Sequence, residues 1–440
     1  MDLDFTTVGA VAIAALLFLL GMGLPIGIDF LLVGACGVAL LLGPEAMVSL
    51  AGETMYSAIA SPTFCVLPLF ILMGAFAARG GFAERAYRSI HVIAARVPGS
   101  LAIATSFGSA VFASICGSSL ATATVFGKIA YPEMKRFKYD KSFALGSIAS
   151  SGTFACMIPP SGMFILFAMF TDQSVGRLFM GGIVPGILTA VTYAASMYLR
   201  AKRTPALAPV VPEELTVRAA DRARAVIDIW PILLLSGIVI GGIYSGLFTS
   251  TEAGAVGAVG ALLFGIVYGN LKRGSEIRAA LRESAHTTSM LFFIIVTALF
   301  FSRFLAITRI PFDLADFLQG WAVPPIVILG CIFLLWMILG MLIVQAAVFA
   351  LTLPILFPVV VSLGYDPVWF CVVAMKLNEI AGVTPPVGLN AFGLAGVAGS
   401  EVKVEDVFRG IWPFVLCDLI VLVLLILFPN IVLFLPNAMM

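Results

Sequence analysis

The sequence predicts an all-α polytopic membrane protein made of two inverted-topology repeats, and three observations support this fold class. Of the 440 residues, 61% are hydrophobic and 11% are charged, whereas soluble domains are about half apolar and about a quarter charged. Apolar segments recur along the whole chain, and a Pro-Pro pair interrupts one such segment in each half. At roughly 20 apolar residues per crossing, the length allows roughly ten spans. The composition therefore excludes a water-soluble enzyme and a nucleic-acid-binding protein.

The first half of the chain begins with three apolar segments that are long enough to span a bilayer. Its acidic start, MDLDFTT, lacks the basic region of a cleaved signal peptide. In order, we expect spans at 8–28, 30–47 and 58–78, an amphipathic stretch at 82–97, an apolar Gly/Ser/Thr-rich segment at 98–131, a basic loop at 131–141, a segment at 142–170 interrupted by SGTFACMIPPSG, and a span at 177–199.

The second half repeats that order, which indicates an internal duplication. It has spans at 227–247, 250–270 and 287–305, an amphipathic stretch at 307–320, an apolar segment at 323–360, a segment at 366–398 interrupted by AGVTPPVGLN, and a last span at 411–435. The Pro-Pro pairs match: 42 positions separate Gly117 from Pro159, and 45 separate Gly340 from Pro385.

The basic residues predict how the two halves are oriented. If 98–131 and 323–360 each form a re-entrant hairpin, most Lys and Arg residues fall on one side of the membrane, in loops at 79–97, 132–141, 200–226 and 271–286. The opposite loops at 48–57, 248–252 and 361–365 have none. Because Lys and Arg are retained in the cytoplasm, the first half starts outside and the second starts inside. The repeats are therefore expected to be inverted, with both termini periplasmic.

The Pro-Pro pairs and the hairpin centres predict a binding site. Consecutive prolines unwind a helix, and the freed backbone groups must line a cavity or be buried in protein, because lipid offers them no partner. Carbonyl and hydroxyl oxygens suit Na⁺, and helix N-termini suit an anion. A Gly/Ser cluster alone more often marks tight helix packing, but two clusters, two breaks and the repeated order together favour a transport site.

Two charged residues lie in an apolar segment, one helical turn apart. Lys376 and Glu379 precede the second break, and charges within a membrane are costly unless they are paired. They form either a structural ion pair or part of a coupling mechanism. No nucleotide-binding P-loop motif is present, so ATP bound by this chain is not the expected energy source.

Several motifs, in this order, resemble the large membrane subunit of tripartite ATP-independent periplasmic (TRAP) transporters, of the DctM type. They are LPLFILMGAFAARGG, ICGSSLAT, YPEMKRFKYD, GTFACMIPPS, FTSTEAGAVGA, VTPPVGLN and FRGIWPF, and together they cover essentially the whole chain. The combination is highly specific, whereas any single motif is not.

The resemblance implies an elevator-type transporter in the bacterial inner membrane, with no enzymatic activity and no cofactor beyond Na⁺ as the coupling ion. It implies scaffold helices at 1–97 and 227–320, transport units at 98–199 and 321–440, and a cytoplasmic basic linker at 200–226. The partners it implies are a separate small four-helix membrane subunit, a periplasmic substrate-binding protein and the lipid bilayer. The expected cargo is a small organic acid of the carboxylate type.

The resemblance also implies the site residues. For Na⁺ they are Ser114, Gly117, Ser118, Ser119, Gly152, Ala155, Cys156, Gly340, Gln345, Gly382 and Thr384. For substrate they are Ser118, Ser119, Thr153, Pro159, Pro160, Pro385, Pro386 and Asn390. The chain departs from the family pattern at Cys116, at Ala155-Cys156 and at Val344, where many members have other residues, and these departures suggest an unusual substrate.

Other functions remain open at this stage. A Na⁺/carboxylate symporter that needs no binding protein would have a similar architecture. A passive channel is a weaker alternative, which counterflow exchange in proteoliposomes would distinguish from a carrier. A multispan membrane enzyme is also weaker, because the apolar segments lack a cluster of catalytic acids, histidines or metal ligands.

Overall fold

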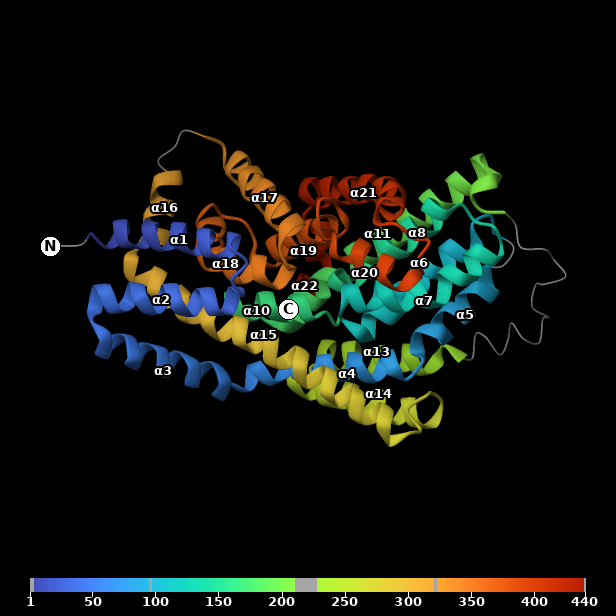
Figure 1. The fold of residues 1–440 in the computed structure, drawn as a ribbon, viewed down its shortest axis with the longest axis horizontal. Helices are drawn as coiled ribbons and strands as arrows, with labels where there is room; N and C mark the ends of the chain where they lie inside the picture. Colours follow the sequence, from blue (N-terminus) through green and yellow to red (C-terminus); the bar gives the residue numbers. More distant parts are fainter. Residues whose placement is uncertain (1–3, 95–96, 210–227, 320–322, 439–440) are drawn as a thin grey trace.

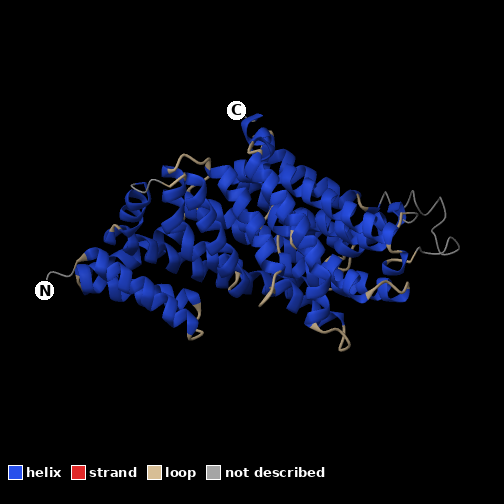
Figure 2. Ribbon diagram, turned by 90° about the horizontal axis from the view of Figure 1, so that it is seen from above, coloured by secondary structure: helices blue, strands red, loops and turns tan. Residues whose placement is uncertain are grey.

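The structure is a computed structural model that describes residues 4–94, 97–209, 228–319 and 323–438. Throughout these ranges the chain is helical, with turns and loops but no strand, which confirms the all-α prediction (Figures 1 and 2). Most of the expected linker, 210–226, lies outside the described residues, as do positions 95, 96 and 320 of the two amphipathic stretches.

The first half contains most of the elements predicted for it, including two helices that turn back on each other and a helix interrupted at Pro-Pro. Its helices are α1 (Phe5–Gly21), α2 (Ile26–Leu42), α3 (Pro44–Ala60), α4 (Val66–Arg79), α5 (Phe82–Ala94), α6 (Ser100–Cys116), α7 (Ser119–Arg136), α8 (Lys141–Gly152), α9 (Phe154–Met157), α10 (Gly162–Thr171) and α11 (Val175–Arg203), with short 3₁₀ turns at Pro62–Cys65 and Pro205–Leu207.

In the second half, the helices from α15 to α21 follow the same order as those from α4 to α11 in the first half. Its helices are α13 (Trp230–Tyr244), α14 (Ser250–Val267), α15 (Gly274–Thr308), α16 (Ile310–Gln319), α17 (Pro325–Leu342), α18 (Gln345–Ser362), α19 (Pro367–Val383), α20 (Leu389–Ala398), α21 (Val404–Leu427) and α22 (Asn430–Ala438). Among the described helices, eight are long and apolar enough to cross a membrane, and α1, α2, α6, α13 and α20 are shorter apolar helices.

The predicted bounds differ most from the structure at two places. The loop expected at 48–57 is wrong, because α3 runs through it. Gly43, at a φ of 92°, ends α2, and Pro44 begins α3 directly afterwards. Glycine is favoured just after a helix, and proline is favoured at the first position of a helix. Helix α15 begins at Gly274 rather than near 287, so it takes in the basic stretch that was expected to be a loop.

The contacts between the two halves are reciprocal. Helix α8 packs on α21 and α19 packs on α11, so the last long helix of each half covers the interrupted helix of the other. In the same way, α4 packs on α14 of the second half, and α15 packs on α2 of the first. Helix α7 likewise packs on α20, and α18 packs on α10. A two-fold relation between the halves would give these contacts. The opposite orientation of the halves in a membrane, and the division into scaffold and transport units, stay predictions.

The α8–α21 contact is made directly between backbones. A Cβ placed on Gly146 would lie 2.2 Å from the carbonyl carbon of Gly410, and one placed on Gly410 would lie 1.8 Å from the carbonyl oxygen of Ser142. Because side chains at Gly146 and Gly410 would force the helices apart, these two glycines allow α8 and α21 to approach closely.

The basic residues can test the orientation. The C-terminal ends of α5, α7 and α11 and the turn between α14 and α15 lie toward the same end of the molecule, at the right of Figure 1. With the exposed Cys36, Cys65 and Cys331 replaced by alanine, we expect Lys138→Cys and Ser250→Cys to react with an impermeant thiol reagent from opposite faces of the membrane, Lys138→Cys from the cytoplasmic face. Reaction of both from one face would contradict the inverted repeats.

Candidate functional site

The first helix pair turns at Gly117 and Ser118, between α6 and α7. Gly117 has a φ of 62°, a left-handed conformation that glycine adopts without strain. Ser118 is the N-cap of α7, and its side chain accepts a hydrogen bond from the backbone N–H of Ala121 at 3.4 Å. The corresponding turn between α17 and α18 is formed by Ile343 and by Val344, whose side chain cannot cap α18.

Both Pro-Pro pairs interrupt their helices, as the sequence predicts. Helix α9 ends at Met157 and α10 begins at Gly162, while α19 ends at Val383 and α20 begins at Leu389. In the first break, the Ser161 hydroxyl donates to the carbonyl oxygen of Cys156 at 3.0 Å and accepts from the N–H of Met163 at 3.3 Å. Ser161 thus satisfies one backbone group on each side of the interruption.

Each turn, called a tip below (Gly117-Ser118 and Ile343-Val344), lies against the Pro-Pro interruption, or break, of its own half. A Cβ placed on Gly117 would lie 3.4 Å from the carbonyl oxygen of Pro160. In the other half, the N–H of Val387 donates to the carbonyl oxygen of Met341 at 3.3 Å. Backbone groups of the breaks therefore lie against the helix-pair tips, where the protein can offer them partners.

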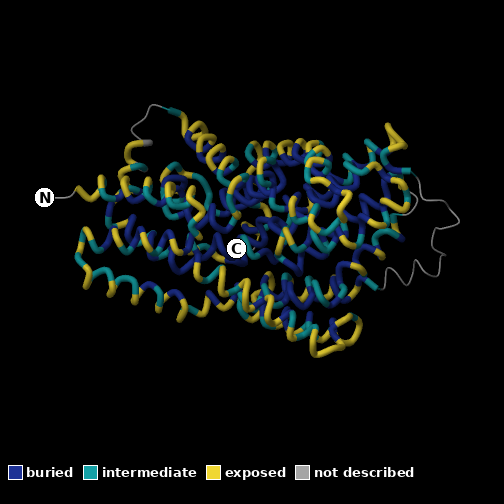
Figure 3. Tube along the Cα trace, viewed as in Figure 1, coloured by how far each residue is buried: buried dark blue, intermediate teal, exposed yellow. Residues whose placement is uncertain are grey.

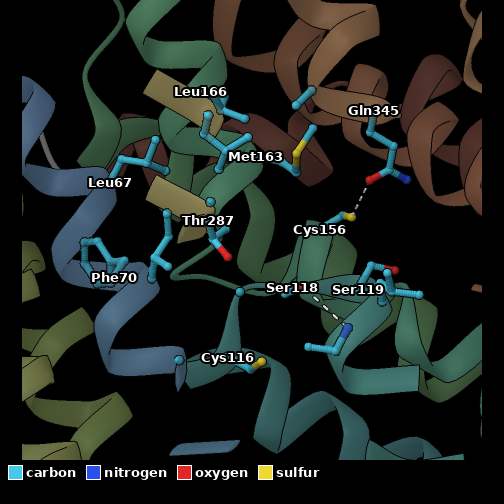
Figure 4. A pocket seen from close by; sticks show the side chains of 18 of the residues that line it. Leu67, Phe70, Cys116, Ser118, Ser119, Cys156, Met163, Leu166, Thr287 and Gln345 are labelled. Carbon is cyan, nitrogen blue, oxygen red and sulfur yellow. Dashed lines mark hydrogen bonds between the residues drawn. The ribbon is translucent and has the colours of Figure 1, made fainter. Parts of the chain in front are cut away.

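A cavity of about 410 Å³ opens where the tips, the breaks and two long helices meet (Figure 4). One side is polar and is formed by residues at the tips and breaks, including Ser118, Ser119, Cys156, Gln345 and Asn390. The other side is formed by α4, α10 and α15, mainly through the apolar side chains Leu67, Phe70, Ile71, Met163, Leu166, Met290 and Leu291. A concave site of this size with few polar groups is typical of a small-molecule site.

The structure brings about half of the predicted site residues to the cavity. Those that line it are Gly117, Ser118, Ser119, Cys156, Pro160, Gln345, Gly382 and Asn390. Those that do not are Ser114, Gly152, Thr153, Ala155, Pro159, Gly340, Thr384, Pro385 and Pro386.

Some residues outside the cavity have structural contacts. The Ser114 hydroxyl lies 2.8 Å from that of Ser236 on α13. Gly152 and Gly340 allow close packing, since a Cβ on either would lie 2.7 Å from the Cβ of Ala123 or Ala381, respectively.

The α15 residues of the cavity were not foreseen. Glu283, Ser284 and Thr287 line it, and no motif marks them because the packing of α15 against the rest of the chain places them there. Glu283 is the only charged residue among the described lining residues, and its carboxylate pairs with Arg79 of α4 at 3.0 Å.

Hydrogen bonds connect polar groups from both halves around the cavity. Asn390 donates through its amide to the Ser119 hydroxyl at 2.6 Å. The Cys156 thiol donates to the Gln345 amide oxygen at 3.3 Å, and the Gln345 amide nitrogen donates to the carbonyl oxygen of Asn378 at 2.6 Å. These bonds join α7 to α20, α9 to α18 and α18 to α19, so the site is complete only when both halves are folded.

The two intramembrane charges pair with each other and with a third. Lys376 Nζ lies 2.8 Å from Glu379 Oε2 and 2.6 Å from Asp418 Oδ1, and all three side chains are fully buried. Tyr193 donates to the other Asp418 oxygen at 2.6 Å, and Lys376 donates to the Thr189 hydroxyl at 3.0 Å. The structure confirms the pairing and adds Asp418 of α21, which the sequence analysis did not identify.

Two interrupted helices and two helix-pair tips that enclose a partly polar cavity define a membrane transporter. Residues 13–431 match the family model described as the DctM component of the tripartite ATP-independent periplasmic transporter. The chain belongs to this family, as the sequence motifs predicted. It is therefore a multi-pass inner-membrane transport component and not an enzyme.

Similarity to individual relatives supports the same conclusion. The chain is 34% identical to the C4-dicarboxylate TRAP transporter large permease protein of Pseudomonas aeruginosa, covering 90% of this chain and 91% of the relative. It is 30% identical to the sialic acid TRAP transporter large permease protein of Vibrio cholerae, covering 95% and 96%.

Among solved structures, the YdaH transporter of Alcanivorax borkumensis superposes with a TM-score of 0.65 at 15% identity, covering 97% of this chain and 98% of that one. MtrF of Neisseria gonorrhoeae superposes with a TM-score of 0.61 at 13% identity, covering 97% and 95%. At these identities the likeness concerns the fold alone.

Loss of the buried Lys376 ammonium group should strongly destabilise the fold. Lys376→Met leaves two buried carboxylates without their shared partner, and we expect it to lower the free energy of unfolding by about 3–5 kcal/mol. The control is Lys135→Met, which removes an exposed ion pair with Glu401 at 2.6 Å and should change stability little. Thermal unfolding in detergent compares the two, and equal melting temperatures would contradict a structural role for the cluster.

Proposed function

We propose that this chain is the large permease subunit of a Na⁺-driven TRAP importer that takes up a small organic acid delivered by a periplasmic binding protein. The observation that carries the proposal is the cavity, where the tips and breaks of both halves meet around polar groups. The family description, one component of a tripartite transporter, supports a separate small membrane subunit and a binding protein as the other two.

The arrangement of helix ends suits an anion. The first residues of α7, α10, α18 and α20, which are Ser119, Gly162, Gln345 and Leu389, all line the cavity. Each helix N-terminus carries a partial positive charge and free N–H groups. An organic anion can therefore be held here although none of the described lining residues is Lys, Arg or His. The names of relatives, which include transporters of C4-dicarboxylates and sialic acid, support this class of cargo.

The same region suits Na⁺. Carbonyl oxygens at the C-terminal ends of α6, α9, α17 and α19 are freed by the tips and breaks. Ser118, which follows Gly117, adds a hydroxyl at the first tip. The carbonyl oxygens of Val383 and Thr384 lie 3.1 and 3.2 Å from a Cβ placed on Gly388. An ion site of uncharged oxygens at each break fits a monovalent cation whose gradient drives uptake. We propose that the tips and breaks move together past α4 and α15 as an elevator.

Coupling is tested by uptake into proteoliposomes that contain this chain. We expect uptake to require an inward Na⁺ gradient, the small subunit and the loaded binding protein. Full uptake with a proton gradient in Na⁺-free buffer would refute the ion assignment. Uptake by this chain alone would instead identify a symporter that works without a binding protein.

The tip hydroxyl should matter for Na⁺. We expect Ser118→Ala to raise the Na⁺ concentration needed for half-maximal uptake several-fold, because the ion site would lose one of its oxygen ligands. Ser118→Gly should have the same effect, and since glycine is tolerated at an N-cap, it separates ligand loss from helix stability. The control is Ser106→Ala, which removes a buried hydroxyl of α6 outside the cavity. Unchanged Na⁺ dependence in both Ser118 variants would show that the first tip serves helix packing and does not bind Na⁺.

A further inference from the structure

Three charged side chains meet where α4 ends and α15 begins. Arg79, the last residue of α4, pairs with Glu276 at 3.3 Å and with Glu283 at 3.0 Å, both on α15. One guanidinium is thus shared by two carboxylates, which leaves a surplus of negative charge. Glu283 lines the cavity, whereas Arg79 and Glu276 do not, so this surplus acts on the cavity through Glu283.

The charged group lies at one end of the cavity, beyond the first tip. The cavity follows α4 from Leu67 to Ala78. The first tip lies against the middle of this wall, because a Cβ placed on Gly74 would lie 2.4 Å from the carbonyl oxygen of Cys116. Ala78 is one helical turn beyond Gly74, and the next residue is Arg79.

Solvent reaches the cavity at this end. Glu283 and Thr287 are exposed although both line the cavity, and they lie one turn apart on the same face of α15. In Figure 4, Thr287 lies on the same side of the cavity as Leu67 and Phe70, opposite Gln345. Helix α15 begins here, after the turn that Figure 1 places at the end of the molecule that the basic residues assign to the cytoplasm.

The charge inside the cavity differs in sign from much of the surface around its opening. Arg278 and Arg282 of α15 are exposed, but neither lines the cavity. Among the described lining residues, Glu283 is the only charged one. A carboxylate in a wall that is otherwise apolar repels an anion, and the apolar surroundings strengthen its field.

We infer that Glu283 lowers the affinity of this opening for organic anions, so that cargo released into the cytoplasm is hindered from binding again. Arg79 holds the carboxylate at the opening and, because it is shared with Glu276, neutralises it only in part. The inference rests on the proposed function, since it takes the cargo to be an organic anion. It adds the residue that favours release at one end of the cavity.

Thiol reagents of opposite charge measure this field without any cargo. Thr287→Cys places a thiol one turn from Glu283. Its thiolate attacks the sulfenyl sulfur of a methanethiosulfonate, which forms a disulfide and releases methanesulfinate. The reagent is either cationic, with a trimethylammonioethyl group, or anionic, with a sulfonatoethyl group. The ratio of the two rates does not depend on the fraction of thiolate, which is common to both.

The full chain in lipid nanodiscs is the sample. Its other accessible and cavity-lining thiols are removed by Cys36→Ala, Cys65→Ala, Cys116→Ala, Cys156→Ser and Cys331→Ala, and the rates of this background are subtracted. Relative to 2-mercaptoethanol, we expect the Thr287→Cys chain to favour the cationic reagent about tenfold. Glu283→Gln should abolish this preference.

Two further variants identify the source of the field. Arg79→Gln leaves two carboxylates without their shared cation, so it should increase the preference for the cationic reagent. The matched control is Glu53→Gln, which removes an exposed carboxylate that pairs with Arg303 at 3.1 Å outside the cavity. It should leave the ratio unchanged.

The side of the membrane from which the thiol reacts tests the role in release. Both reagents should modify Thr287→Cys in inside-out vesicles and not in right-side-out vesicles. An equal ratio with and without Glu283→Gln, or an equal change with Glu53→Gln, would overturn the role of Glu283. Reaction only from the periplasmic face would overturn its role in release, and no reaction from either face would overturn the opening. None of these results bears on Na⁺-driven uptake, whose failure would instead overturn the proposed function.

Discussion

The arrangement of the site follows from one constraint, which is that a backbone group inside a membrane must find its partner within the protein. The prolines at 159–160 and 385–386 remove helical hydrogen bonds, and each break is then placed against a tip of the same half. Four helices consequently begin at one cavity, so their N-terminal N–H groups converge there. The protein obtains a polar site without placing a free charge in it.

The buried cluster around Lys376 shows the opposite solution to the same problem. Here full charges are buried, and the desolvation cost is offset by short contacts among residues of α11, α19 and α21. Within the described part of the chain, Glu379 Oε1 and Asn378 Nδ2 have no hydrogen-bond partner. Since Lys376 and Glu379 lie within two turns of the end of α19, the cluster fixes the helix just before it is interrupted.

The sequence predicted those features that depend on local backbone chemistry. The breaks and the first tip could be located because Pro and Gly act on their own segment, and the motifs identified the family. The α4 and α15 side of the cavity, the Ser236 partner of Ser114 and the Asp418 partner of Lys376 arise from packing between distant segments, for which a single sequence carries no signal. Helix α3 was missed because Gly43-Pro44 ends one helix and starts the next with no loop between them.

The direct backbone contact between α8 and α21 has a consequence for biogenesis. Helix α8 is synthesised early, but Gly410, whose backbone covers it, is synthesised 264 positions after Gly146. Until then the narrow face around Gly146 is open to lipid or to another protein. The packing of the first half around α8 is therefore completed only after α21 has been synthesised.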